Sequence, residues 1–588
     1  MKINYISLLP VFILSSVGIV NAQKDTTRLK QEVEVTKAYQ PSISDAFKIN
    51  DIPQIKEEKT DKPVFEYSIS SEPVFSTFSV KPVQAATMVG EPKTELGKGL
   101  LKLGIGNYLT PYGELFYNAI PGNKSNFGMH FKHLSSHGKI KLVNDDKVDA
   151  PFSDNAAEIF GKRFYRNSTL TVTGFFDRKG LQYYGYTGDK LTDAEKEAII
   201  PTWQDKQVFS KGGVDFCLKS NTGASASSDM KYDLGFNFQY FGAKTGQREN
   251  LGKMQVSLNK NLDQFEGLLE SSLTFYYADK IANRVTPASN QKKQILLMVN
   301  PAIVFTGDNA LLQIGAKTYT MIDDDEDARI VVTPNVKAEW SPVENILTLY
   351  AHAGGDFGHN VYSKIAAENP FAAPDHDIRN TEYQYILSGG IRGKFSSKTN
   401  YRAGVSYSGI KDMHFYYAQG FDYYSEESSF RNLQNTLDVV YDDLKLLKLT
   451  GEFFHAASEN LSFHLEGNYY SYEMETLAQP WHMPEFDVDL SLIYKTDGPL
   501  CFTLDAYVIG KRQALFVDSW SSMILPGFTE TIYPMDPVFD LNASVEYQYN
   551  RKLGFFLQLN NFAFQHYETW SGYANQGFNV LAGVNFSF

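Results

Sequence analysis

Hydrophobic and polar positions alternate in the last segment of the chain, residues 577–588. On one set of positions the residues are apolar, namely Phe578, Val580, Ala582, Val584, Phe586 and Phe588. The intervening residues are small or polar, namely Gly577, Asn579, Gly583, Asn585 and Ser587, with Leu581 as the one exception. Because successive side chains of a strand point to opposite faces, this pattern predicts a β-strand with one apolar face and one polar face.

The same alternation recurs at 232–240, 486–495 and 541–550. Its polar positions include charged residues such as Asp487 and Lys495, which a packed core excludes unless they are paired. A wide barrel instead places such residues in a water-filled lumen and turns the apolar face to lipid. The pattern therefore predicts an all-β protein, a single transmembrane antiparallel β-barrel.

The connections between the predicted strands fall into two kinds, which alternate along the chain. The short ones lie at 121–125, 166–168, 307–310, 341–345, 396–400, 496–499 and 549–552. The long ones lie at 138–155, 188–205, 358–379, 419–432, 518–534 and 565–575. Short periplasmic turns and longer outer loops are typical of outer-membrane barrels. Counting hairpins through 97–588 predicts about 22 strands.

The N-terminal part of the chain has a different character. Residues 1–22 combine Lys2 with an apolar stretch at 6–20 and small residues before the expected cleavage site after Ala22, which predicts a secretory signal peptide. Residues 23–96 form a charged leader with a proline about every ten residues, at Pro41, Pro53, Pro63, Pro73, Pro82 and Pro92. Such spacing favours extended chain. The leader either hangs in the periplasm or docks inside the lumen, and the aromatic-rich stretch 64–80 favours docking.

Composition excludes several classes of function. The net charge of −13 (55 basic against 68 acidic residues) gives no basis for binding nucleic acid. Aromatic residues make up 14% of a chain whose mean hydropathy is only −0.31, as expected of a barrel that meets both lipid and water.

The two cysteines, Cys217 and Cys501, are expected to be packing residues. On a strand, His130 and His133 point to opposite faces, and His133 and His137 lie about 13 Å apart, so the three cannot share a metal; no metal or cofactor is predicted.

No nucleophile, base and orienting group can be assembled from the sequence, so the protein is not expected to be an enzyme. The outer loops instead carry a surplus of aromatic residues, and we expect these to form a platform for a ligand or a partner. The candidates are Trp481, Trp520, Phe528, Tyr533, Tyr567, Trp570 and Tyr573. The simpler interpretation is that their rings, with Trp203 and Trp340, anchor the barrel at the membrane surface.

Several stretches resemble a family of outer-membrane barrels of Bacteroidota described as TonB-dependent receptors or TonB-dependent receptor-like proteins. They include EVEVTKAYQPSISDAFKINDIP, VFSTFSVKP, HFKHLSSHGKIK, RKGLQYYGY, VVYDDLKLLKLTGEFF, AQPWHMPEFDVDLSLIYK and the C-terminal FLQLNNFAFQHYETWSGYANQGFNVLAGVNFSF. The resemblance covers about 32–588 and implies a 22-strand barrel with a role at the outer membrane, in uptake or in a function descended from uptake. Members carry a folded plug domain larger than 23–96, so the plug is expected to be absent or reduced here.

Two short segments are candidate partner signals. Glu32, Val33, Glu34, Val35 and Thr36 form a β-prone stretch that resembles a TonB box, which adds a strand to a periplasmic partner; the alternative is an incidental extended stretch. The last strand, with Phe578, Phe586 and Phe588, resembles the C-terminal signal read by the barrel-assembly machinery.

Two functions follow from these features. The favoured one is an outer-membrane receptor or transporter of the TonB-dependent receptor-like type that takes up or gates an unknown ligand. The alternative is a non-transporting barrel that holds surface lipoproteins or secretion components. The expected partners are outer-membrane lipid and lipopolysaccharide, the barrel-assembly machinery, and either TonB or surface lipoproteins.

Overall fold

The computed structural model describes residues 98–588 except 120–121, 123, 187–205, 222–229, 280–290, 325–326, 375–376, 420–434 and 522–525; the side chains of 419 and 518–529 are also not described. The predicted signal peptide, the leader with the TonB-box candidate, and Trp203 lie outside the described residues.

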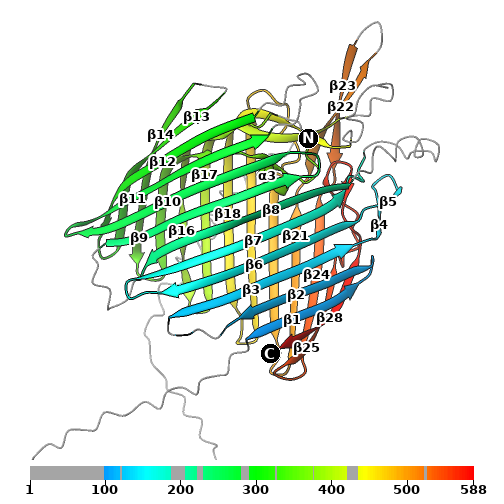
Figure 1. Ribbon diagram of the computed structural model, residues 1–588, viewed down its shortest axis with the longest axis horizontal. Helices are drawn as coiled ribbons and strands as arrows, with labels where there is room; N and C mark the ends of the chain where they lie inside the picture. Colours follow the sequence, from blue (N-terminus) through cyan, green and yellow to red (C-terminus); the bar gives the residue numbers. More distant parts are fainter. Residues whose placement is uncertain are drawn as a thin grey trace, which may run out of the picture. The chain divides into compact units, whose positions relative to one another are not determined.

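Twenty-two antiparallel strands form one closed ring, which confirms the predicted fold class and strand number (Figure 1). The ring strands are β1 (Gly99–Gly106), β2 (Thr110–Asn118), β3 (Ser125–Ser136), β6 (Phe152–Phe164), β7 (Ser168–Gln182), β8 (Lys206–Ser220), β9 (Met230–Ala243), β10 (Arg248–Leu262), β11 (Phe265–Asp279), β12 (Gln291–Thr306), β13 (Ala310–Asp323), β14 (Arg329–Val343), β15 (Leu347–Gly358), β16 (Thr381–Ser396), β17 (Thr399–Gln419), β18 (Leu437–Ala456), β19 (Leu461–Met474), β20 (Phe486–Lys495), β21 (Leu500–Ile509), β24 (Val538–Gln548), β25 (Leu553–Asn560) and β28 (Asn579–Ser587).

The ring closes between its first and last strands. β28 pairs with β25 on one side and with β1 on the other, where Leu103 faces Val584 and Lys102 faces Asn585. At the end of this seam the carbonyl of Phe588 accepts hydrogen bonds from the backbone N–H groups of Lys98 (2.6 Å) and Gly99 (2.9 Å). Closure leaves no strand edge of the ring unpaired, which a barrel in lipid requires.

The two faces of the strands have the alternation that the sequence predicts. In β28, Val584 and Phe586 are 37% and 42% exposed on the outside, whereas Asn585 between them is only 8% exposed and faces inward. Outward aromatic and aliphatic residues recur around the ring, for example Phe236 and Phe238 on β9 and Ile303 on β12. Such an apolar outer band is typical of transmembrane barrels.

The inward face is polar, and several of its charged groups are partnered across strands. The guanidinium of Arg392 on β16 donates to Glu339 on β14 (2.6 Å), and Ser491 on β20 donates to Asp505 on β21 (2.6 Å). Asn468 on β19 likewise donates to Asp487 on β20 (2.9 Å). These contacts explain why charges predicted on the wet face are tolerated inside the ring.

The connections divide into tight turns at one end and long segments at the other. The turns include 263–264, 344–346 and 397–398. The long segments hold further elements, namely β4 (Lys139–Lys141) with β5 (Lys147–Asp149), α3 (Tyr362–Glu368), β22 (Arg512–Ser521) with β23 (Pro526–Met535), and β26 (Glu568–Trp570) with β27 (Tyr573–Ala574). None of the described helices is long and apolar enough to cross a membrane.

The segment between β21 and β24 corrects one sequence expectation. Residues 518–534 were expected to be an outer loop, but most of them belong to the β22–β23 hairpin, which stands out beyond the rim (Figure 1). β21 pairs directly with β24, so the hairpin is an insertion into the ring connection. The hairpin pairs with a ring strand through a short parallel stretch, in which Ala418 and Gln419 face Phe516 and Val517. The sequence does not reveal this hairpin, because its strands lack the alternation of apolar and polar residues that a strand needs over the full length of a membrane crossing.

Candidate functional site

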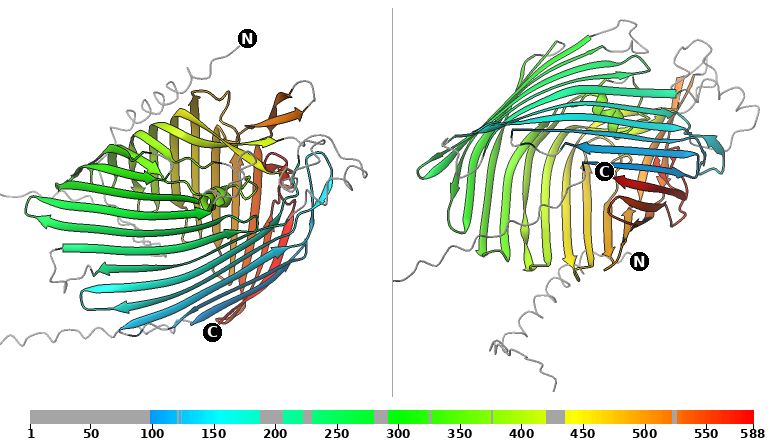
Figure 2. Two further views of the ribbon diagram at one scale, coloured as in Figure 1. Left: turned by 45° about the horizontal axis from the view of Figure 1, so that its top comes forward. Right: turned by 60° about the horizontal axis from the view of Figure 1, so that its bottom comes forward.

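The segment between β15 and β16 folds inward and lies across the mouth of the barrel, with α3 at its centre (Figure 2). On one side Tyr362 packs against Phe209 of β8 and Phe241 of β9, with ring centroids 6.4 and 6.0 Å apart. On the other side Ile365 packs in one cluster with Tyr416 of β17 and with Leu437 at the start of β18. The helix thus bridges two well-separated parts of the ring. We call residues 359–380 the bridge.

The local sequence explains the short helix. Tyr362, Ile365 and Ala366 follow a spacing of three and four, which places them on one face, and all three are buried. The last turn closes where the N–H of Asn369 donates to the carbonyl of Ile365 (2.7 Å). Pro370 then disfavours helical conformation at Asn369 and ends the helix.

A carboxylate from the barrel wall caps this helix. Val361, at the N-cap position, supplies no side-chain hydrogen bond. Instead Glu249 of β10 accepts hydrogen bonds from the backbone N–H groups of Tyr362 (2.8 Å) and Ser363 (3.0 Å) and from the hydroxyl of Tyr276 on β11 (2.5 Å). A negative group at the helix start satisfies N–H groups that have no partner within the helix. Sequence reasoning missed Glu249 because it lies 113 positions before the helix.

Further contacts tie the rest of the bridge to the ring. The side chain of Gln247 donates to the carbonyl of Pro374 (2.7 Å), and Lys292 donates to that of Ile378 (3.1 Å). The N–H of Leu437 donates to the carbonyl of Phe371 (2.9 Å), while the N–H of Ala373 donates to that of Leu437 (2.8 Å). The bridge is therefore fastened at both sides and along its length.

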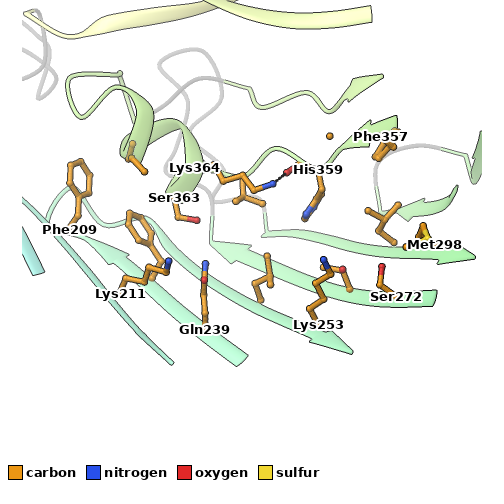
Figure 3. A pocket seen from close by; sticks show the side chains of 18 of the residues that line it. Phe209, Lys211, Gln239, Lys253, Ser272, Met298, Phe357, His359, Ser363 and Lys364 are labelled. Atoms are coloured by element: carbon orange, nitrogen blue, oxygen red, sulfur yellow. Dashed lines mark hydrogen bonds between the residues drawn. The ribbon is translucent and has the colours of Figure 1, made fainter. Parts of the chain in front are cut away.

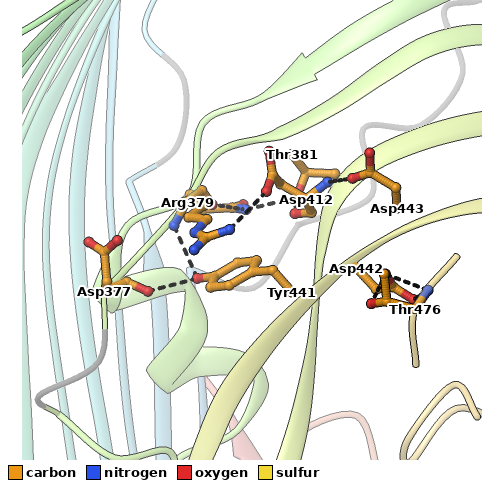
Figure 4. Close-up of polar contacts among 9 residues, drawn as sticks. Asp377, Arg379, Thr381, Asp412, Tyr441, Asp442, Asp443 and Thr476 are labelled. Atoms are coloured by element: carbon orange, nitrogen blue, oxygen red, sulfur yellow. Dashed lines mark hydrogen bonds and ion pairs between the residues drawn. The ribbon is translucent and has the colours of Figure 1, made fainter. Parts of the chain in front are cut away.

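A polar network fixes the end of the bridge where it returns to β16 (Figure 4). The hydroxyl of Tyr441 on β18 donates to the carbonyl of Asp377 (3.1 Å) and accepts from the N–H of Arg379 (3.1 Å). The guanidinium of Arg379 lies 5.3 Å from the centre of the Tyr441 ring and 3.4 Å from Asp412 on β17. This network joins the bridge to the two longest strands.

The neighbouring residue on β18 holds a second outer segment. Asp442 accepts hydrogen bonds from the hydroxyl of Thr476 (2.6 Å) and from the backbone N–H of Leu477 (2.9 Å), as Figure 4 shows for Thr476. A carboxylate that receives several such bonds orders the chain that supplies them. The segment 475–485, which carries Trp481, is thereby held against β18.

The aromatic candidates from the outer loops do not share one exposed platform. Trp481, Tyr567 and Tyr573 are only 3%, 6% and 2% exposed, so for these three the expected exposed platform is wrong. The physical reason is that the outer segments pack on one another: Tyr573 stacks on Phe371 of the bridge (3.6 Å), and Trp570 meets Tyr416 edge-on (4.8 Å).

The other candidates are placed differently. Tyr533 is half-buried on β23, and Trp520 and Phe528 lie on β22 and β23, where their side chains are not described. Trp340 is exposed on the outer face beside the turn 344–346. Phe586 and Phe588 also face outward, and the ring of Phe578 packs on Phe564 (4.7 Å). A ligand or partner role for the aromatic candidates stays a prediction.

Buried polar residues join the outer segments beneath these rings. Arg512 donates to the backbone carbonyls of Glu568 (2.6 Å) and Thr569 (2.8 Å), and His482 accepts from the N–H of Ser571 (3.3 Å). Burial raises the pKa of the Glu568 carboxyl to about 7 and lowers the pKa of His482 to about 3. These groups lie where the outer segments 475–485 and 565–577 pack together, rather than on a surface open to solvent. We call these two packed segments the cap.

Two chambers lie on the lumen side of the bridge. The first has a volume of about 690 Å³ and is lined by the inner faces of β7–β13 and by residues from 356–367 (Figure 3). Lys211, Gln239, Lys253 and Ser272 point from the strands toward the bridge. On the bridge side, Nε2 of His359 donates to Oε1 of Gln294 (3.0 Å), and burial next to Lys364 lowers the pKa of His359 to about 4.

The second chamber, about 700 Å³, lies against β2–β3, β6–β7, β24–β25 and β28, and Lys179 and Ala367 line both chambers. Its charged residues are Asp154, Glu368, Asp540, Lys132 and Lys179. Carboxamides, including Gln558, Asn560 and Asn575, make up much of the rest. Trp570, Tyr567 and Tyr573, three of the predicted aromatic candidates, also border this chamber.

Metal and cysteine chemistry find no support in the described ranges. Within them, no group of three or more His, Cys, Asp or Glu is arranged to hold a metal ion. Cys217 on β8 and Cys501 on β21 are both free thiols, and Cys217 donates to Asp233 (3.4 Å).

A closed ring of 22 strands with short turns at one end and folded segments at the other is the architecture of large transmembrane β-barrels. No family model matches the sequence, and no curated protein matches it. Several solved structures match the fold of the chain.

The pyoverdine outer membrane receptor FpvA from Pseudomonas aeruginosa PAO1 is 11% identical, with 84% of this chain and 79% of that chain covered and a TM-score of 0.61. The FrpB iron transporter from Neisseria meningitidis is 10% identical, with 84% and 82% covered and a TM-score of 0.62. The copper transporter OprC is 10% identical, with 84% and 83% covered and a TM-score of 0.59. At this identity the likeness shows the fold. The three are named as receptors and transporters rather than enzymes.

Proposed function

We propose that the protein is an outer-membrane receptor or transporter of the TonB-dependent receptor-like type. The observation that carries this proposal is the closed 22-strand ring, wide enough to enclose two ligand-sized chambers beneath a bridge of outer segments. The solved structures with the same ring are named as receptors and transporters, which supports the same class here. The ligand is bound between the long outer segments and the lumen.

The apolar outer band supports a location in the outer membrane, in contact with lipid and with lipopolysaccharide at the rim. The exposed Phe586 and Phe588 suit recognition by the barrel-assembly machinery. Residues 23–96 serve as a reduced plug that docks in the lumen, and 32–36 serve as the TonB box.

The test is capture of TonB. A photoreactive amino acid at position 31, next to the TonB-box candidate, is expected to crosslink to TonB in intact cells. Val33→Pro removes a backbone donor from the strand that would pair with TonB, so it should abolish the crosslink while barrel assembly is unchanged. A matched control is Val64→Pro, which lies outside the box. A crosslink that survives Val33→Pro contradicts the assignment of 32–36 as the TonB box, and no crosslink in the unaltered protein contradicts energised transport.

The second candidate function is a static assembly barrel that holds surface lipoproteins or secretion components. The bridge favours it, because hydrogen bonds fasten the bridge to β10, β12 and β18 and lay it across the mouth. Purification after crosslinking separates the two functions. Stoichiometric recovery of a lipoprotein without TonB would favour the assembly barrel.

A further inference from the structure

The chamber between β7–β13 and the bridge differs from the second chamber in charge. Three lysines, Lys179, Lys211 and Lys253, point into the lumen here from β7, β8 and β10. Across the ranges that the structure describes, none of the three forms an ion pair. Lys211 instead makes a cation–π contact, with its Nζ 5.5 Å from the centre of the Phe175 ring.

The acidic residues of this chamber do not balance these charges. Asp356 is already engaged, since it accepts hydrogen bonds from the Tyr319 hydroxyl (2.5 Å) and from the N–H of Phe357 (2.9 Å). Asp177 lies opposite Lys211 in the pairing of β7 with β8, but no ion pair joins them. Lys364 on the bridge adds a fourth ammonium, which donates to the carbonyl of His359.

The strand register arranges the nitrogen donors in a row. Lys211 pairs with Phe241, and Lys253 pairs with Asn237, so Gln239 lies between them on β9. Each step crosses one strand and two residues, which corresponds to about 8 Å from Cα to Cα. Lys211 and Lys253 are therefore about 16 Å apart at their Cα atoms, with the Gln239 amide midway.

His359 lies above this row on the bridge. Burial lowers its pKa most, and the neighbouring ammonium groups of Lys364, Lys292 and Lys253 lower it further. At pH 7 the imidazole is therefore neutral, and its Nε2–H is committed to Gln294. The net positive charge of the chamber consequently rests on the lysines.

The remaining lining is apolar. Phe209 and Phe241 stack on the β8–β9 side with centroids 5.9 Å apart, and Leu296, Met298 and Phe357 border the other side. A chamber of about 690 Å³ is in the range of pockets that enclose small organic ligands. By contrast, the second chamber has three carboxylates against two lysines and many amides, so it offers no comparable excess of positive charge.

We propose that this chamber binds an organic ligand that carries two anionic groups on an apolar frame, with one group at Lys211, the other at Lys253, and the frame against Phe209, Phe241 and Leu296. The Gln239 amide, between the two lysines, orients the ligand by donating to it. This inference rests on the proposed receptor function and names the chemical class of its ligand. Both lysines bind as point charges, so the class covers carboxylates, sulfonates and phosphates.

The test measures binding by isothermal titration calorimetry, with the full-length protein in nanodiscs of a zwitterionic lipid. The probes are naphthalene-2,6-dicarboxylate, the mono-acid 2-naphthoate and the neutral naphthalene-2,6-dicarboxamide. We expect the dicarboxylate to bind with one site per chain. The mono-acid should bind about 10-fold more weakly and the diamide about 100-fold more weakly, since each desolvated charge pair contributes about tenfold or more.

Variants assign the binding to this chamber. Lys211→Gln and Lys253→Gln are each expected to weaken the dicarboxylate about 10-fold, and the double variant should bind it no better than the diamide. The matched control is Lys448→Gln on β18, because Lys448 faces the lumen, lies 5.3 Å from the centre of the Tyr470 ring and does not line this chamber. Unchanged heat-resistant migration in gels shows that each variant has folded.

Three results overturn the inference: no binding of the dicarboxylate to the unaltered protein, equal binding of the diamide, or equal loss in Lys448→Gln. Failure here is distinct from failure of the receptor function. If the dicarboxylate does not bind but TonB is crosslinked, the ligand class is wrong and the receptor stands. If it binds as expected and TonB is not crosslinked, the chamber stands and energised transport falls.

Discussion

Glu249 supplies the sharpest test of how the bridge is held. Its carboxylate accepts two backbone hydrogen bonds from the start of α3 and one from Tyr276. In Glu249→Gln one oxygen can still accept, but the new NH₂ group faces the N–H of Tyr362 or Ser363, so at least one bond becomes a donor–donor contact. Hydrogen bonds to a charged group contribute about 1.5–3 kcal/mol each, so the opening of the bridge should become about 2–4 kcal/mol easier.

The assay is hydrogen–deuterium exchange followed by mass spectrometry on peptides that cover 361–373. A change of about 2–4 kcal/mol corresponds to exchange that is about 30-fold to 1,000-fold faster when opening limits exchange. Tyr276→Phe, which removes one hydroxyl, should have a smaller effect, about 1 kcal/mol. Glu339→Gln is the control, because Glu339 also faces the lumen but is paired with Arg392 instead of the bridge.

Unchanged exchange in 361–373 for Glu249→Gln would refute this reasoning. It would mean that the apolar contacts of Tyr362 and Ile365 hold the bridge without help from the barrel wall. Faster exchange in the Glu339→Gln control would refute it as well, because the effect would then reflect a general loosening of the barrel.

Two further predictions concern the seam and the cap. Val584→Arg, on the outer face, should reduce the free energy of unfolding in bilayers by about 2–4 kcal/mol if the residue lies near the midplane. Asn585→Arg, on the lumen face, should be tolerated, and equal effects of the two changes would contradict the assigned faces. The raised pKa of Glu568 favours the protonated carboxyl in the folded cap, so this contribution is complete below about pH 4.5 and is lost as pH rises through about 7. Exchange at 565–575, corrected for intrinsic rates, should therefore show a loss of about 3 kcal/mol over that range in the unaltered protein, and Glu568→Gln should remove this difference; a variant with the same pH dependence would rule out Glu568 as its source.

The ring could be predicted from the sequence because lipid imposes a rule on every strand. Each crossing has to alternate, as in the paired residues Val584 and Asn585, and the short turns between crossings are marked by residues such as those at 396–400. Repetition of this signal makes the count of strands robust to errors at any one of them.

The bridge and its chambers could not be predicted, because they depend on contacts between distant residues. α3 has only seven residues, and its cap comes from Glu249 on another strand. Lys211 and Lys253 look like ordinary wet-face residues in the sequence, and only the strand register brings them to the two sides of Gln239. Trp481 lies in the connection between β19 and β20, and the sequence cannot show that this segment packs on its neighbours.

The long-range contacts of the cap also set the order of assembly. The hydroxyl of Tyr184, after β7, donates to the carbonyl of Ala574, just before β28, across 390 positions of sequence. The side chain of Asn435 donates to the carbonyl of Tyr183 across 252 positions. Contacts of such high sequence separation form late, because the loops between them have to be closed first. The contact between Tyr184 and Ala574 therefore forms only once the chain just before β28 has reached the barrel, so we expect this part of the cap to be completed last.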